Sequence, residues 1–226
     1  MIAVGVIGIT GRMGKILVDS IESNDELTLS GGISSQNIGK DLEKIVKCSD
    51  VIVDFSHHTA VLAAAKVAAN HAVPLISGTT GLSANDFLQL RQCSQRIPLL
   101  YAANFSIGIQ LIAAFIRRCA GVLKNFDFSI LDKHHRHKKD APSGTALFLA
   151  QQYEEIAKKS PQIVSLRCGN NFGEHVCDFC GEDETITVTH SVLNKRVFAV
   201  GALRCARWIV GKDPGFYGIC DAIDFQ

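Results

Sequence analysis

Residues 2–23 read IAVGVIGITGRMGKILVDSIES, in which an apolar run, a glycine-rich turn and an amphipathic stretch follow one another directly. The apolar residues 2–9 predict a β-strand, and the apolar positions between 16 and 21 lie on one face of a helix. The turn between them, GITGRMG at 8–14, lies where a dinucleotide-binding fold has its glycine turn. Glycines there permit a tight turn and let backbone N–H groups approach a pyrophosphate at the helix N-terminus. The spacing is GxxGxxG, with Thr10 where the usual GxGxxG motif has its second glycine, so a plain glycine-rich turn is the alternative.

The same rhythm of strand and helix continues through the first hundred residues. Residues 51–55 form a fully apolar run, which is typical of a strand buried on both faces of a parallel sheet. Further strands are predicted at 27–33, 73–77 and 99–102, and helices at 59–71 and from Ser83, with Asp86 as its capping partner. Strands that alternate with helices across short turns indicate a parallel, doubly wound sheet.

After Asn104 the pattern changes. Helices are predicted at 107–123, 143–159 and 202–210, a strand at 126–132, and an antiparallel or mixed sheet from the alternating residues 162–200. We therefore predict an α/β protein with a Rossmann-type doubly wound parallel sheet. Residues 1–105 and 202–226 form this dinucleotide-binding domain, and residues 106–201 form an inserted α+β domain for substrate binding and oligomerisation.

The composition excludes several classes of protein. The 226 residues carry 23 Lys and Arg against 22 Asp and Glu, whereas a general nucleic-acid binder has a strong basic excess. The longest uncharged apolar stretch, 105–116, is about half of a membrane span, and the first ten residues lack the features of a signal peptide. We expect a cytoplasmic protein that binds neither nucleic acid nor membranes. The eight cysteines agree with a reducing compartment, and Cys177 and Cys180 are interpreted as incidental thiols rather than as a metal or redox pair.

The most informative stretch is KHHRHKKDAPSGT at 133–145, where four cations and three histidines fall within seven residues. It can be a solvated loop, a nucleic-acid patch, a metal site of His134, His135 and His137 weakened by the surrounding cations, or a site for an anionic substrate. The last interpretation is favoured. Arg136 and Lys138 can neutralise carboxylates, and the helix start that follows presents N–H groups and hydroxyls to another carboxylate. A histidine among cations has its pKa lowered and remains competent to transfer a proton near neutral pH.

The order of motifs along the chain resembles that of the 4-hydroxy-tetrahydrodipicolinate reductase (dihydrodipicolinate reductase) family. The resemblance covers nearly the whole chain. Its motifs are the glycine turn at 8–14, GTTG at 78–81, AANFSIG at 102–108, KHHRHKKDAPSGTA from Lys133, GEH at 173–175, and the segment with Arg204 and Trp208. Several long motifs in the right order make an accidental match implausible.

The resemblance implies an enzyme that reduces a cyclic dicarboxylate with NADPH or NADH, with loss of water, in the diaminopimelate route to lysine. It implies His134 as the main proton donor and acceptor and Lys138 as a second catalytic cation. The residues expected to bind substrate are His135, Arg136, Ser143, Gly144 and Thr145. Those expected to bind the cofactor are Gly8, Ile9, Thr10, Gly11, Arg12, Met13, Ser34, Gly78, Thr79, Thr80, Ala102, Ala103, Asn104 and Phe105. No metal is expected, and family members are typically homotetramers joined through the sheets of their substrate domains.

The sequence departs from the family where cofactor preference is usually decided. The stretch GGISSQN at 31–37 has no acidic residue to hold a ribose hydroxyl, while Arg12 lies in the glycine turn and Lys40 is close by. We therefore expect NADPH to be used at least as well as NADH. The alternative function is a catalytically inactive Rossmann regulator that binds NAD(P)H, but such a protein is expected to lose His134 or Lys138, and both are present.

Three further residues receive smaller claims. His175 and His190 lie in the predicted second sheet, where a packing role is favoured over catalysis. Asp54 follows an apolar strand and is expected either to cap the next helix or to contact the cofactor.

Overall fold

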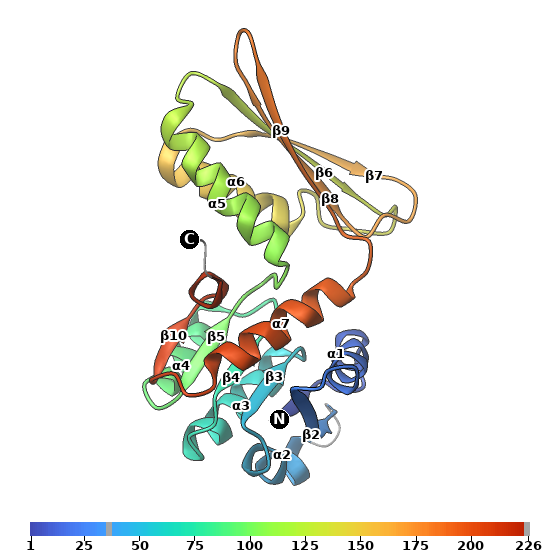
Figure 1. The fold of residues 1–226 in the computed structure, drawn as a ribbon, viewed down its shortest axis with the longest axis vertical. Coiled ribbons are helices and arrows are strands. Elements are labelled where there is room, and N and C mark those ends of the chain that lie inside the picture. The colour runs from blue at the N-terminus through green and yellow to red at the C-terminus, as the bar shows by residue number, and fades with distance from the viewer. Residues whose placement is uncertain (35–37, 224–226) are drawn as a thin grey trace. The chain divides into compact units, whose positions relative to one another are not determined.

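The computed structural model describes residues 1–34 and 38–223, which form two compact units (Figure 1). The first unit comprises Met1–Phe105 with the segment from Arg196 onward, and the second comprises Ser106–Lys195. The first boundary lies at 105/106, where the sequence places it. The second lies at 195/196 rather than at 201/202, because helix α7 (Arg196–Ile209) begins there and belongs to the first unit.

The early start of α7 differs from the expectation that residues 162–200 contain no helix. The run RVFAV at 196–200 has two valines and a phenylalanine, which favour a strand locally. Packing decides otherwise, since Ala199 and Ala202 are fully buried. Gly201 lets helix α7 pack closely against Phe105 of the same unit, because a Cβ atom at 201 would lie 1.8 Å from the Phe105 carbonyl oxygen.

The first unit is built around a six-stranded sheet in the order β10-β5-β4-β3-β1-β2. Its elements are β1 (Ile2–Ile7), α1 (Arg12–Glu22), β2 (Leu27–Ile33), α2 (Ile38–Lys47), β3 (Val51–Asp54), α3 (His58–Asn70), β4 (Leu75–Ser77), α4 (Ala84–Ser94), β5 (Pro98–Tyr101), α7, β10 (Gly215–Tyr217) and the short 3₁₀ helix η1 (Ile219–Ala222). All the strand pairs are parallel. The sequence does not reveal α2 or β10, both of which are short.

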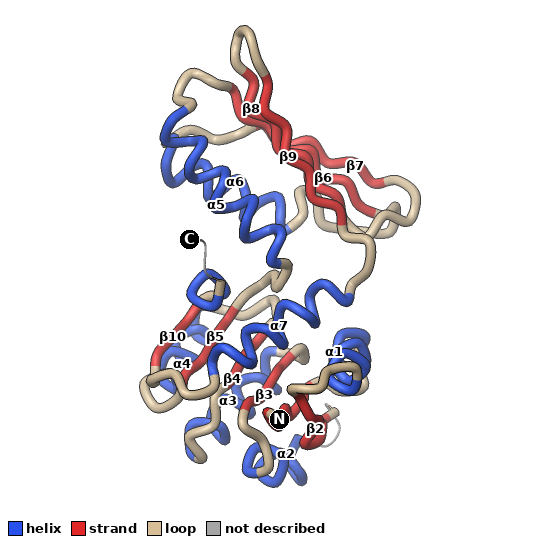
Figure 2. Tube along the Cα trace, viewed as in Figure 1, coloured by secondary structure: helices blue, strands red, loops and turns tan. Residues whose placement is uncertain are grey.

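Helices cover both faces of this sheet, so the predicted doubly wound α/β fold is confirmed (Figure 2). Helices α2, α3 and α4 pack side by side, and α1 packs beside α7. The apolar strand β3 is buried throughout, as expected of a strand covered on both faces. Helix α4 begins with the predicted capping box, in which Ser83 Oγ accepts from the Asp86 amide at 3.2 Å and Asp86 Oδ2 accepts from the Ser83 amide at 2.8 Å.

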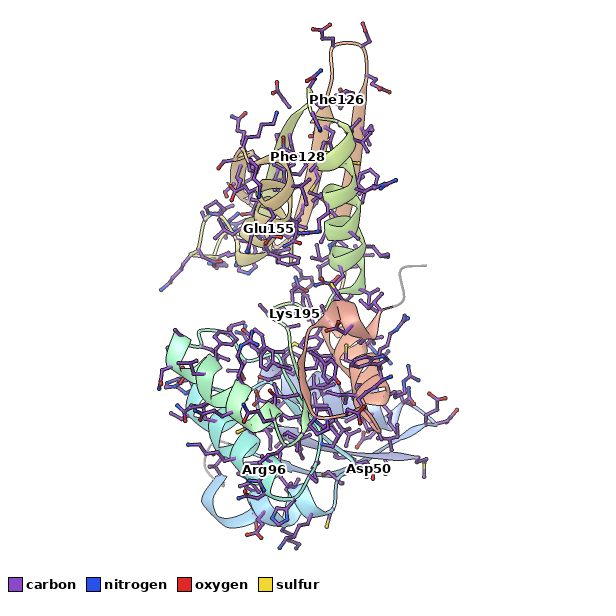
Figure 3. All side chains as sticks on the ribbon, turned by 90° about the vertical axis from the view of Figure 1, so that its left-hand side faces the viewer. Asp50, Arg96, Phe126, Phe128, Glu155 and Lys195 are labelled. Carbon is purple, nitrogen blue, oxygen red and sulfur yellow. The ribbon has the colours of Figure 1, made fainter. Side chains whose placement is uncertain are left out.

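The second unit has a mixed four-stranded sheet in the order β7-β6-β8-β9. Its elements are α5 (Ile107–Val122), β6 (Asp127–His134), α6 (Gly144–Ala157), β7 (Gln162–Arg167), β8 (Glu174–Cys180) and β9 (Thr185–Ser191). Strand β7 runs parallel to β6, whereas β8 and β9 are antiparallel to their neighbours. Helices α5 and α6 cover one face, where Phe128, labelled in Figure 3, lies between the rings of Tyr153 and Phe179 at 4.6 and 4.3 Å.

The other face of the second sheet is not covered within this unit. Along β7 the residues alternate between exposed and partly buried, and Val164 and Leu166 are 45% and 44% exposed. Strand β6 also extends through Lys133 to His134, two residues beyond its predicted end. His134 therefore belongs to strand β6 rather than to the polar loop that follows it. None of the helices in the described ranges is long and apolar enough to cross a membrane.

Candidate active site

The predicted cofactor residues follow the carboxyl ends of the parallel strands. Residues 8–13 follow β1, Ser34 follows β2, residues 78–80 follow β4, and residues 102–105 follow β5. Because the strands are parallel, these segments share one edge of the sheet, which is where open α/β folds bind their ligands. The structure thus brings to this edge segments that are far apart in sequence.

The glycine turn has a backbone that requires its glycines. Gly8 has φ +86°, in the left-handed region that favours glycine. A Cβ atom on Gly14 would lie 2.2 Å from the carbonyl oxygen of Gly8, so the turn closes tightly only with glycine there. Gly11 is the N-cap of α1, without a side-chain capping bond and without an acidic residue in the first helical turn. The turn and helix N-terminus together fit a pyrophosphate.

The fully buried Asp54 fixes the segment that follows β4 through hydrogen bonds. Asp54 Oδ2 accepts from Ser77 Oγ at 2.8 Å and from Thr79 Oγ1 at 2.7 Å, and Ser56 Oγ donates to the other oxygen. Burial raises the pKa of Asp54, although these hydroxyl groups oppose the shift. Asp54 therefore neither caps helix α3 nor reaches the surface. It orders the 78–80 segment, and the hydroxyl of Thr79 is occupied in that contact.

The remaining predicted cofactor residues differ in exposure. Ala102 and Phe105 are buried, and the Phe105 ring lies 5.6 Å from that of Phe55, so these two shape the segment from within. Ala103 is exposed and Asn104 half-buried. Ser35, Gln36, Asn37 and the side chain of Lys40 lie outside the described residues, so the expected NADPH preference stays a prediction.

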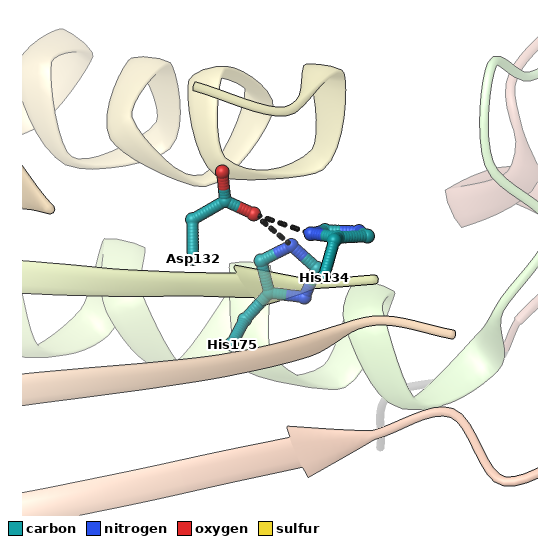
Figure 4. Close-up of side chains that lie close together, drawn as sticks. All are labelled: Asp132, His134 and His175. Carbon is teal, nitrogen blue, oxygen red and sulfur yellow. Dashed lines mark ion pairs between the residues drawn. The ribbon is translucent and has the colours of Figure 1, made fainter. Parts of the chain in front are cut away.

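The end of β6 places three polar side chains together (Figure 4). Asp132 and His134 are two residues apart on the strand, so both continue the inward face that Phe128 and Ile130 begin. His175 on β8 pairs directly with Asp132 in the antiparallel register. Asp132 Oδ1 lies 2.8 Å from His134 Nδ1 and 3.5 Å from His175 Nε2.

The carboxylate of Asp132 is fully buried and held by several donors. Its Oδ2 accepts from Arg167 Nη2 at 2.9 Å, from the Ser143 amide at 2.8 Å and from Ser165 Oγ at 3.0 Å. Burial alone raises the pKa of Asp132, but these hydrogen bonds outweigh it and hold the pKa well below its usual range. Asp132 is therefore ionised throughout the physiological pH range.

Both histidines are held largely neutral near pH 7. Burial lowers the pKa of His134, the charge of Asp132 opposes that shift, and Lys138 and Arg167 add to it. Burial lowers the pKa of His175 to about 4, against the same opposition from Asp132. His134 Nδ1 faces Asp132, which leaves Nε2 for proton exchange. A Cβ atom on Gly173 would lie 2.9 Å from that Nε2, so glycine at 173 leaves the imidazole its space.

The basic loop after β6 is fixed through its backbone. The His135 amide donates to the Asn171 carbonyl at 2.8 Å, and the Arg136 amide donates to the Gly169 carbonyl at 3.1 Å. Arg136 is exposed, whereas His135 is half-buried. Lys138 Nζ contacts both carboxylate oxygens of Asp140, at 2.8 and 2.7 Å. The backbone of the loop is therefore held in one conformation. Lys138 is paired with the exposed carboxylate of Asp140, which a ligand carboxylate could replace.

Three predicted substrate residues lie at the start of helix α6. Ser143 is buried, its amide binds Asp132, and its Oγ accepts from the Ala146 amide at 3.1 Å and contacts His175 Nε2 at 3.2 Å. It therefore caps the helix, and its expected contact with substrate stays a prediction. Gly144 is exposed, and a Cβ atom there would meet nothing within 4 Å, while Thr145 is half-buried. No acidic residue lies in the first turn of α6, so its N-terminus can receive a carboxylate.

The three side chains of Figure 4 also form a potential set of metal ligands, since their donor atoms lie within 4.8 Å of one another. This set differs from the His134, His135 and His137 set considered from the sequence. Arg167 already binds Asp132 Oδ2, and the positive charge of Lys138 lowers the pKa of His134. The positive charges of Arg167 and Lys138 repel a metal cation, so the chemistry of the cluster favours proton transfer over metal binding.

The pair Cys177 and Cys180 lies on β8, with Cys177 buried and Cys180 exposed. The two thiols thus point to opposite faces of the sheet, as their spacing on a strand predicts. Burial raises the pKa of Cys177 to about 12, which makes it an inert structural thiol.

Comparison with known proteins covers both units. The family model described as "Dihydrodipicolinate reductase, N-terminus" matches residues 2–105, and "Dihydrodipicolinate reductase, C-terminus" matches residues 108–223. The chain belongs to the dihydrodipicolinate reductase family. Two relatives named 4-hydroxy-tetrahydrodipicolinate reductase show how far the similarity extends. That of Caldanaerobacter subterraneus subsp. tengcongensis is 33% identical over 99% of this chain and 98% of its own length, and that of Rickettsia rickettsii is 36% identical over 98% of each.

The fold of the family is also seen in a solved structure, the dipicolinate-bound dihydrodipicolinate reductase from Paenisporosarcina sp. TG-14. It matches with a TM-score of 0.87 at 23% identity, over 99% of this chain and 100% of that one. At this identity the likeness establishes the fold. The family models and relatives thus confirm the family that the sequence motifs resemble, and the solved structure confirms the architecture.

Asp132 and Arg167 are site residues that sequence reasoning missed. A signal for Asp132 exists, because the inward alternation of Phe128 and Ile130 on the predicted strand leads to an aspartate at the next inward position. A charged residue at a core position requires a partner. No such signal identifies Arg167, because the parallel pairing of β7 with β6 cannot be inferred from the sequence pattern. His175, interpreted as a packing residue, is buried but contacts Asp132 and Ser143.

Replacing Gly173 with alanine tests how tightly His134 is placed. Gly173→Ala is expected to lower kcat in the reductase assay described below by about 10²-fold, because an added Cβ displaces the imidazole and small misplacements of a catalytic group are costly. The control is Gly121→Ala on helix α5, where the nearest atom, in Ile156, is 3.8 Å from the new Cβ. Measuring kcat and Tm for both variants checks the effect. Normal turnover by Gly173→Ala contradicts it.

Proposed function

We propose that this protein reduces 4-hydroxy-tetrahydrodipicolinate to tetrahydrodipicolinate with NAD(P)H and loss of water, in the diaminopimelate route of lysine biosynthesis. The observation that carries the proposal is the buried Asp132–His134 pair at the base of the cationic loop, in a chain whose relatives are named as this reductase. The solved family member is named as dipicolinate-bound, and dipicolinate is a small cyclic dicarboxylate. The cations of this loop suit such a ligand.

The nicotinamide cofactor, when bound, supplies a hydride. The first unit provides its site, with the glycine turn at 8–14 and the start of α1 for the pyrophosphate, and the segments 78–80 and 102–105 along the same sheet edge. The fit is supported by the tightness of the glycine turn, which could not close with a side chain at Gly14, since a Cβ atom there would lie 2.2 Å from the Gly8 carbonyl oxygen. We propose that NADPH is used at least as well as NADH, since Arg12 is exposed on the first turn of α1.

His134 supplies the proton. Hydride addition at C4 of the conjugated ring leaves negative charge that a proton on the neighbouring carbon must neutralise. His134 acts as the acid in its protonated form, which carries the transferable proton on Nε2 while Nδ1 faces the buried carboxylate of Asp132; burial lowers its pKa from the ordinary value, so this proton is readily given up. It releases a proton readily near neutral pH and can be reprotonated from solvent, since its side chain is 10% exposed.

The substrate carboxylates bind to cations and to a helix N-terminus. Lys138 exchanges its internal partner Asp140 for a substrate carboxylate, and Arg136 adds a second positive charge from the exposed side of the loop. His135, which is half-buried in the same loop, also contacts the substrate. The backbone at Gly144 and Thr145 receives the other carboxylate at the start of α6, while Ser143 holds that helix end in place.

A spectrophotometric assay tests the function directly. With substrate generated by the preceding synthase, the absorbance of NADPH and NADH at 340 nm is expected to fall only when protein and substrate are both present. kcat/KM with NADPH should equal or exceed that with NADH. A strong preference for NADH contradicts the cofactor proposal. Cofactor binding without turnover contradicts the catalytic proposal and supports the inactive regulator.

Substitutions in the loop assign the two catalytic roles. His134→Gln is expected to lower kcat by about 10²–10⁴-fold with a smaller change in KM, because it removes the acid and keeps the shape. Lys138→Ala is expected to lower kcat/KM by about 10–100-fold through both constants, because a charge-assisted contact is lost. Lys139→Ala is the control on the same loop, since Lys139 is exposed and has no assigned role. An unchanged kcat for His134→Gln removes that residue from the mechanism.

We also propose that the protein is a homotetramer joined through the open face of the second sheet. Apolar side chains, among them Val164 and Leu166, stand on that face without cover from their own unit. Burying such side chains against another copy is favourable. Multi-angle light scattering is expected to give about four times the chain mass of 24.5 kDa, and a monomer mass contradicts the proposal. A cytoplasmic location stays a prediction from the cysteine content.

A further inference from the structure

We propose that Asp132 is the positioning residue for His134: its buried carboxylate fixes the imidazole with Nε2 toward the reacting atoms and links this orientation to the start of helix α6. The inference rests on the proposed function, since it concerns the acid of that reaction. Asp132 itself is not expected to touch substrate or cofactor, because it is fully buried.

The first argument is that the carboxylate has no freedom to move. Its Oδ2 is held by Arg167 Nη2, the Ser143 amide and Ser165 Oγ, at 2.8 to 3.0 Å. Arg167 is fixed in turn, because its Nη1 donates to the Asp132 carbonyl at 3.0 Å and its Nη2 to the Asp140 carbonyl at 2.7 Å. The other oxygen, Oδ1, is thereby presented to His134 from a fixed direction.

The second argument concerns the histidine. His134 Nδ1 lies 2.8 Å from Oδ1. Because an ionised carboxylate has no proton to donate, the tautomer of His134 that carries its proton on Nδ1 is favoured. The same pairing is the general way in which a carboxylate sets the tautomer of a histidine and leaves the other ring nitrogen for chemistry. Gly173 packs against the Nε2 side of the ring, and a Cβ atom there would lie 2.9 Å from Nε2, so the imidazole keeps this orientation only with glycine at 173.

The third argument is the link to the substrate-binding helix. The Ser143 amide binds the same carboxylate, and Ser143 caps α6 just before Gly144. One buried charge thus fixes both the acid and the helix end that is proposed to receive a substrate carboxylate. A carboxylate present only to anchor Arg167 has no need of its second contact.

The charges that face His134 come from every element around it. Asp132 lies on its own strand β6, Arg167 on β7, His175 on β8 and Lys138 in the basic loop. Among these four described residues Asp132 is the negative one, and its charge raises the affinity of His134 for a proton. Neutralising it should therefore lower the pKa of His134 further and shift the corresponding limb of the kcat profile to lower pH.

The test compares Asp132→Asn with Asp178→Asn in the full-length protein. Asparagine at 132 keeps the shape and an acceptor for the Ser143 amide, but it loses the charge and places a donor against Nδ1. Asp178→Asn is the matched control, because it makes the same change on β8 at a carboxylate whose partner is the Thr187 hydroxyl rather than a residue of the site. For Asp132→Asn we expect kcat to fall by about 10²-fold or more with a smaller change in KM. Asp178→Asn should stay within about threefold of the parent.

A second readout does not depend on turnover. Nitrogen-15 NMR of labelled histidine is expected to show His134 as the Nδ1–H tautomer in the parent and in Asp178→Asn. In Asp132→Asn we expect the Nε2–H tautomer, because the amide nitrogen then donates to Nδ1, and a lower titration midpoint. If the parent protein does not turn over, the proposed function fails, and the NMR comparison still decides whether Asp132 orders His134.

Three results overturn the inference. The first is a parent-like kcat, pH profile and His134 tautomer in Asp132→Asn. The second is an equal loss in both variants, accompanied by a fall in Tm, which makes the role of Asp132 purely structural. The third is loss of activity on dialysis against a chelator with recovery on addition of Zn²⁺, which makes Asp132 a metal ligand instead.

Discussion

The buried carboxylate of Asp132 is the interaction on which the second unit depends. Taking a charge out of water is costly unless it is paired and its remaining lone pairs are hydrogen-bonded. Arg167 provides the opposite charge, and the Ser143 amide and Ser165 hydroxyl complete the set. Removing one partner of such a buried pair typically costs about 3–5 kcal/mol. The ends of β6, β7 and α6 are therefore held together by one side chain, and His134 inherits its position from them.

A second buried aspartate, Asp54, shows how the pairing with Arg167 changes the pKa of Asp132. Asp54 in the first unit is as buried as Asp132, but its side-chain partners, Ser56, Ser77 and Thr79, are uncharged hydroxyls. Burial accordingly raises the pKa of Asp54, whereas the guanidinium of Arg167 turns the balance and lowers that of Asp132. Asp54 orders the 78–80 segment as a hydrogen-bond acceptor. Asp132 acts as a permanent negative charge beside the histidines.

The two units divide the chemistry between them. The first has a parallel sheet, whose strand ends collect several glycine-rich segments at one edge and so suit a large cofactor. The second has a short mixed sheet, whose inward face changes from apolar at Phe128 to ionic at Asp132 within one strand. An apolar core and the cluster of Asp132, His134 and His175 are thus continuous along β6. His134, the proposed acid, stands on a strand rather than on a loop, which limits its motion.

The sequence by itself determined the Rossmann-type unit and the family, because periodic apolar runs, the glycine turn and the motif at 133–145 are local signals. It did not determine that 196–200 is helical, that β6 reaches His134, or that Ser143 is turned inward to Asp132. Each of these depends on a partner distant in the chain. The contacts of Asp132 with Arg167 and of Asp132 with His175 exist only because β7 and β8 flank β6, so the tertiary structure decided which residues surround the acid.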